Sequence, residues 1–170
     1  MTSGTIPNGS TNYAASNEPL SNDDVIDTVN NLIETCRDGQ EGFQQAAEAI
    51  NDSELKTLFY EYSQQRAQFG AVLMELVREL GGDPAHSGST AGALHRGWMD
   101  LKGAITGGSE ESILNECERG EDSAKDAYKD ALEKNLPSNI ADVVRQQATA
   151  VQAAHNRVRE LRNAESRAAS

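Results

Sequence analysis

The chain has 170 residues, which suits one compact domain rather than two. Its 27 acidic and 15 basic residues give a net charge of −12, which argues against non-specific binding to nucleic acid. A mean hydropathy of −0.61, with no apolar run approaching about 20 residues, argues against a membrane-spanning protein. We therefore expect a protein partner, not yet identified, and neither a nucleic-acid nor a membrane partner.

The first 20 residues, MTSGTIPNGSTNYAASNEPL, are rich in Ser, Thr, Asn and Gly and have neither a basic start nor an apolar stretch. Such a composition cannot bury enough area to offset the entropy of ordering, and it does not resemble a secretory signal. Two cysteines are also too few for a secreted disulfide framework. The sequence predicts a disordered tail over 1–20 and a cytoplasmic protein.

Four long segments repeat apolar residues at helical spacing, and the four prolines lie outside them. They predict helices over about 22–50, 54–80, 109–135 and 139–162. No stretch alternates apolar and polar residues with a period of two, so we expect no sheet. The predicted domain spans 21–163, and residues 164–170 are predicted to form a C-terminal tail.

The segment between the second and third long helices is too long for a hairpin turn. Its second half places Leu94, Trp98, Leu101 and Ile105 at helical spacing, which predicts a short amphipathic helix capped by Ser89 or Thr90. We expect Trp98 to be buried against the bundle. A long crossover of this kind makes the flanking helices parallel, so the predicted fold is an all-α, ferritin-like four-helix bundle.

The apolar stripes are interrupted near the middle of each long helix. A mid-helix Glu on a core face needs a compensating group, so we expect Glu121 to pair with Arg66 or His155. The interrupting residues are Gly39, Gln40, Gln65, Arg66, Gly120, Glu121, Gln147 and Gln152.

Di-metal bundles use a Glu on each of two helices and a Glu-x-x-His pair on each of the other two. This chain contains no Glu-x-x-His and offers only Gln152 with His155, and a guanidinium at Arg66 repels cations. The chain therefore lacks several of the ligands that a di-metal site needs. The alternative is a noncanonical iron or manganese site formed by Glu118, Glu121, Gln152 and His155.

Four stretches of the chain resemble a bacterial family of ferritin-like four-helix bundles, a domain of unknown function. The resemblance covers about 22–162 and implies the fold and membership without an activity. The stretches are DGQEGF with AAE (Asp38 to Glu48), GSTAGALHRGWMDLK (Gly88 to Lys102), ERGED (Glu118 to Asp122) and HNRV (His155 to Val158).

A comparison with di-iron relatives such as the rubrerythrins implies that two of six ligands remain. Glu121 is similar to the third-helix Glu, and His155 is similar to the fourth-helix imidazole. The other four positions fall on or near residues that differ from the ligands of those proteins, namely Cys36, Ser63, Arg66 and Gln152.

These observations favour a non-enzymatic interaction or stress-associated protein with a degenerate di-metal site, with no catalytic residue and no cofactor predicted. The alternative is a metal-binding or oxidase-like protein. A third hypothesis is a homodimer, since bundles often bury an extra face in this way. Cys36 and Cys117 are interpreted as small buried hydrophobes, with a facing redox pair as the alternative.

Charge is distributed unevenly along the chain. From Ser138 onward five arginines oppose three acids, and no Lys or Arg precedes Arg37. The basic strip can serve as a docking surface, but we favour a solvated helix end whose cations offset the helix dipole. It consists of Arg157, Arg159, Arg162 and Arg167.

Overall fold

The computed structural model describes residues 18–86, 98 and 100–170, and in this part of the chain every regular element is a helix. Most of the predicted N-terminal tail, and the residues Ser89, Thr90 and Leu94, lie outside the described residues. The helices are α1 (Asn22–Ala49), α2 (Ser53–Glu79), α3 (Leu101–Thr106), α4 (Glu110–Leu132) and α5 (Ser138–Ala168). The prediction of an all-α bundle is confirmed for the described residues.

Side chains cap the N-termini of three of the long helices. The Ser21 hydroxyl accepts the Asp24 N–H, the Asp52 carboxylate accepts two backbone N–H groups, and the Ser109 hydroxyl accepts the Ser112 N–H. Each cap satisfies backbone donors that have no partner within the helix.

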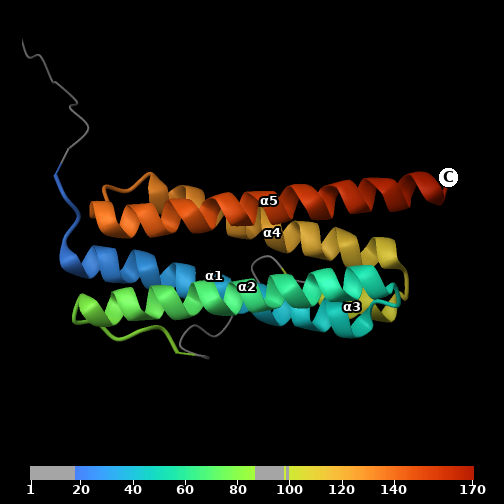
Figure 1. Cartoon of the computed structure of the whole chain (residues 1–170), viewed down its shortest axis with the longest axis horizontal. Helices are drawn as coiled ribbons and strands as arrows, with labels where there is room; N and C mark the ends of the chain where they lie inside the picture. The colour runs from blue at the N-terminus through green and yellow to red at the C-terminus, as the bar shows by residue number, and fades with distance from the viewer. Residues whose placement is uncertain (1–17, 87–97, 99) are drawn as a thin grey trace, which may run out of the picture.

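The last helix is longer than predicted, because α5 continues through most of the expected tail to Ala168. Two contacts with α4 lie near this end of α5, one from the last residue of the predicted helix and one from within the extension. Arg162 Nε lies 3.0 Å from Glu118 Oε2, and the Ser166 hydroxyl donates to Glu111 Oε1 at 2.7 Å. Figure 1 shows the C-terminal end of α5 projecting beyond the neighbouring helices.

Two antiparallel hairpins, α1–α2 and α4–α5, pack side by side (Figure 1). Asn22 Nδ2 donates to the Leu80 carbonyl, so α1 begins where α2 ends. The Asp52 N–H donates to Glu110 Oε1, so α2 and α4 begin at the same end. Helices α2 and α4 therefore run in the same direction, and Leu80 and Ser109 lie at opposite ends of the bundle.

The core consists of two apolar clusters, one toward each end of the bundle. One cluster includes Val29, Leu73 and Val144, and the other includes Phe43, Phe59 and Leu114. The polar residues Arg66 and Glu121 lie at intermediate positions along α2 and α4. The mid-helix interruption of the apolar stripes thus corresponds to a polar layer between the clusters.

Trp98 is buried, as expected, with 6% of its surface exposed. Its indole lies against the backbone of Gly42 on α1 and Gly120 on α4, where an added Cβ would overlap the ring. These two glycines, unfavourable within a helix, are therefore explained by close approach of the indole.

The short crossover helix differs from its prediction, because α3 begins only at Leu101 and Trp98 precedes it. The Asp100 N–H donates to the buried carboxylate of Glu116 at 3.0 Å. This bond holds the backbone before the helix against α4, and Trp98 itself lies outside the helix.

We predict that Trp98→Ala lowers the free energy of unfolding by roughly 3–5 kcal/mol, as truncation of a large buried aromatic does. Gly120→Ala alone should cost about 1–3 kcal/mol, because its methyl group overlaps the indole. In the Trp98→Ala background the same change should instead stabilise by about 1 kcal/mol, the helix preference for Ala over Gly. Urea unfolding of the four proteins measures the cycle. Equal effects of Gly120→Ala in both backgrounds would contradict the packing described.

Candidate functional site

The centre of the bundle holds a buried ion pair between α2 and α4. Arg66 Nη2 lies 2.6 Å from Glu121 Oε2, and both side chains are at most 2% exposed. Arg66 Nη1 also donates to Gln65 Oε1 at 2.8 Å. The Arg66 Nε has no hydrogen-bond partner among the described residues. The expectation that Glu121 pairs with a mid-bundle cation is confirmed, and the cation is Arg66.

Neighbouring residues leave space for the guanidinium and cover it. A Cβ at Gly39 of α1 would lie 3.1 Å from Arg66 Cγ, so a larger residue would crowd the arginine stem. The Arg66 guanidinium carbon lies 5.9 Å from the ring centroids of both Phe43 and Phe69. Cation–π attraction offsets part of the cost of removing the charge from water.

The two charges of the pair depend on each other. Burial raises the pKa of the Glu121 carboxyl above its ordinary value, and the Arg66 guanidinium opposes that shift. Burial lowers the pKa of Arg66, but Glu121 raises it more, and the pKa lies above its usual value. Because protonating Glu121 would leave Arg66 as an isolated buried charge, we regard the pair as ionised.

A second buried polar group links α1, α4 and α5. The Tyr128 hydroxyl donates to Gln147 Oε1 at 2.7 Å and lies 3.2 Å from Cys36 Sγ. Burial raises the pKa of the Cys36 thiol to about 11 and the pKa of Cys117 well above its usual value. Both cysteines are free and buried, and they lie in different apolar clusters, which favours the interpretation as hydrophobes over the redox pair.

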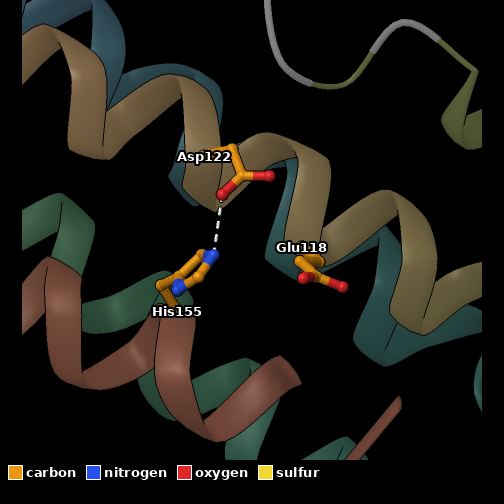
Figure 2. Close-up of side chains that lie close together, drawn as sticks. All are labelled: Glu118, Asp122 and His155. Carbon is orange, nitrogen blue, oxygen red and sulfur yellow. Dashed lines mark ion pairs between the residues drawn. The ribbon is translucent and has the colours of Figure 1, made fainter. Parts of the chain in front are cut away.

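Three metal-ligating side chains, Glu118, Asp122 and His155, form a cluster where α4 faces α5 (Figure 2). His155 Nε2 lies 2.7 Å from Asp122 Oδ1, and the side chains are 5% and 57% exposed, respectively. One ligand atom from each of the three residues lies within 4.8 Å of the others. Glu118 and Asp122 are one helical turn apart on α4 and therefore share a face.

The structure brings together only part of the predicted metal set. Glu118 and His155 lie in one cluster, whereas Glu121 is bound to Arg66 in the core. The exposed Gln152 donates to Asn156 Oδ1 at 2.9 Å. The set of four as a metal site stays a prediction.

Sequence reasoning missed Asp122, which it named only as the end of the ERGED stretch. Its position four residues after Glu118 was the available signal, because residues at this spacing are neighbours on a helix. The sequence offers His155 as an alternative partner of Glu121, but the next residue along the chain, Asp122, supplies the carboxylate that contacts His155.

The fold and the buried pair define an all-α bundle with a charged interior layer. The family model described as a domain of unknown function, DUF2383, matches residues 24–134. This match covers more than half of the chain, so the protein belongs to the DUF2383 family. The match starts within the first turn of α1, includes α2 to α4 and ends before α5. A search of curated proteins finds no match to the chain. Among the described residues, no helix has the length and apolar character needed to cross a membrane.

We predict that Arg66→Met lowers the free energy of unfolding by roughly 3–5 kcal/mol, because it leaves Glu121 as an unpaired buried carboxylate. The double variant Arg66→Met with Glu121→Gln should recover much of this loss. Chemical unfolding measures both. Arg78→Met is a matched control on the same helix, since Arg78 is exposed and pairs only with Glu75 in the described residues; its effect should stay within about 0.5 kcal/mol.

The loss in Arg66→Met should also depend on pH. Without the guanidinium, the pKa of Glu121 in the folded state rises further above that in the unfolded state, so folding takes up a proton. The folded variant is then relatively more stable at low pH. The difference between its free energy of unfolding and that of the wild type grows as pH rises toward the folded-state pKa of Glu121. A deficit equal at pH 5 and pH 8 would mean that Glu121 is solvated or otherwise compensated.

Proposed function

We propose that the protein is a ferritin-like bundle without a di-metal centre, which acts by binding another protein rather than by catalysis. The connectivity supports the ferritin-like part: α2 and α4 run in the same direction, and the segment joining them has its ends at opposite ends of the bundle. Ferritin-like folds use one long crossover of this kind.

The observation that carries the proposal is the guanidinium of Arg66 in the bundle centre. A pair of iron or manganese ions needs several carboxylates and imidazoles there. Arg66 instead brings a positive charge, and it already forms an ion pair with Glu121. Ser63, near a ligand position implied by the resemblance, donates to the Gln40 carbonyl, and Cys36 contacts Tyr128. The residues present therefore do not fit a di-metal centre.

Iron loading tests this proposal. The metal-free protein is mixed with Fe²⁺ without oxygen and then exposed to air while iron oxidation and oxygen consumption are followed. We expect the rates of the buffer blank. Catalysed oxidation that saturates at two irons per chain would overturn the proposal, and its loss in Glu121→Gln would locate the iron in the bundle centre.

The proposed partner is a protein with a basic surface. The net charge of −12 favours a complementary cationic face, and the acidic excess lies before Ser138. A second copy of the chain offers such a face in the arginines of α5, so a homodimer is included in the proposal. We also propose a cytoplasmic location, which the two free thiols support and cell fractionation can test.

Sedimentation velocity at low and high salt tests the homodimer. Pairing between the α5 arginines of one copy and acidic residues before Ser138 in the other should produce a dimer at low salt that dissociates as salt screens the charges. Reversing two exposed arginines, Arg157→Glu with Arg159→Glu, should abolish the dimer. A mass near 18.3 kDa under all conditions would remove the homodimer from the proposal.

A further inference from the structure

The cluster at the α4–α5 edge combines metal-ligating groups that the buried ion pair does not use. Glu118 and Asp122 project from consecutive turns of α4, and His155 faces them from α5 (Figure 2). The imidazole distinguishes the cluster from an ordinary acidic patch, because His155 is almost fully buried with Nε2 directed at a carboxylate. Asp122 is more than half exposed, so solvent has access from one side.

The spacing of the ligand atoms is close to that of a metal site. Bonds of about 2.0–2.2 Å from nitrogen and oxygen to Zn²⁺ place tetrahedral ligand atoms about 3.3 Å apart. The 2.7 Å contact between His155 and Asp122 must open slightly, and the third ligand atom, within 4.8 Å, must approach. We expect side-chain rotation to make both changes.

We propose that Glu118, Asp122 and His155 form a mononuclear site for a divalent first-row transition ion such as Zn²⁺. One imidazole and two carboxylates suit such ions, and water from the exposed side completes the coordination. The site is separate from the bundle centre, because Glu121, which lies between these residues in sequence, points into the core and binds Arg66. The proposal also holds independently of the partner proposed above.

Asn156, which Gln152 contacts in turn, lies beside the imidazole. Asn156 Oδ1 lies 3.4 Å from His155 Nδ1 and accepts from Gln152 Nε2 at 2.9 Å. A metal ion replaces the proton on Nε2, which passes to Nδ1 or to solvent, and Asn156 Oδ1 then accepts from Nδ1–H. A second hydrogen bond of this type fixes the ring of most metal-bound histidines.

Arg162 competes with the ion. Its Nε lies 3.0 Å from Glu118 Oε2, so a bound cation must share Glu118 with the guanidinium or displace it. The side chain of Arg162 is one-third exposed and can swing into solvent. Arg162 therefore weakens metal binding, and its removal strengthens it.

Titration calorimetry with Zn²⁺ on the tag-free, metal-stripped full chain tests the site, with Mg²⁺ as the oxygen-preferring control ion. We expect one Zn²⁺ per chain, binding at least tenfold weaker in Asp122→Asn and in His155→Ala. Asp122→Asn is the conservative variant, because Asp122 is exposed and its amide retains the shape. Asp142→Asn, at an exposed carboxylate of α5, is the matched control and should leave the affinity unchanged.

The competition between Arg162 and the ion can be measured separately. Arg162→Ala should tighten Zn²⁺ binding by up to about fivefold, the upper range for an ion pair at the protein surface. Absence of saturable Zn²⁺ binding up to about 1 mM would overturn the proposal. Full affinity in both Asp122→Asn and His155→Ala would also overturn it. So would loss of binding in Glu121→Gln with retention in Asp122→Asn, since the ion would then lie in the bundle centre.

Discussion

Arg66 and Glu121 meet where water is excluded, and neither can leave without stranding the other as a buried charge. The pair need not contribute much net stability, since the cost of desolvation offsets most of the attraction. Its effect is on alignment. Sliding α2 or α4 by one turn would separate the two buried charges, so the pair favours one register between the two hairpins. The residues next to Arg66 in this register are Gly39, Phe43 and Phe69.

Adjacent residues of α4 serve different environments because of helical rotation. Each residue turns the helix by about 100°, so Glu121 points into the bundle while Asp122 points to the edge shared with α5. Gly120, one residue earlier, lies against Trp98. The short stretch ERGED thus contacts Trp98, the core and the α4–α5 edge. These different environments account for a glycine and acidic residues standing side by side within a helix.

The long helices and the burial of Trp98 could be predicted because apolar periodicity and caps such as Ser109 are local signals. The pairing of Arg66 with Glu121 was also accessible, since few mid-bundle cations were available. The end of α5 could not be predicted, because Ser166 and Arg162 bind partners in α4 that no local sequence pattern reveals. The start of α3 was missed for a similar reason: Glu116 binds the Asp100 backbone from another helix. The pairing of His155 with Asp122 depends on how α4 and α5 are rotated relative to each other, which local sequence patterns do not determine.

The position of Trp98 has a consequence for how assembly of the bundle can be observed. It is the single tryptophan of the chain, and its indole lies between the backbones of Gly42 and Gly120, which belong to different hairpins. The indole becomes enclosed only when α1 and α4 come together. Intrinsic fluorescence therefore reports the docking of the two hairpins, and far-ultraviolet circular dichroism reports the helices themselves. The protein thus carries a natural optical probe of the contact between its two hairpins.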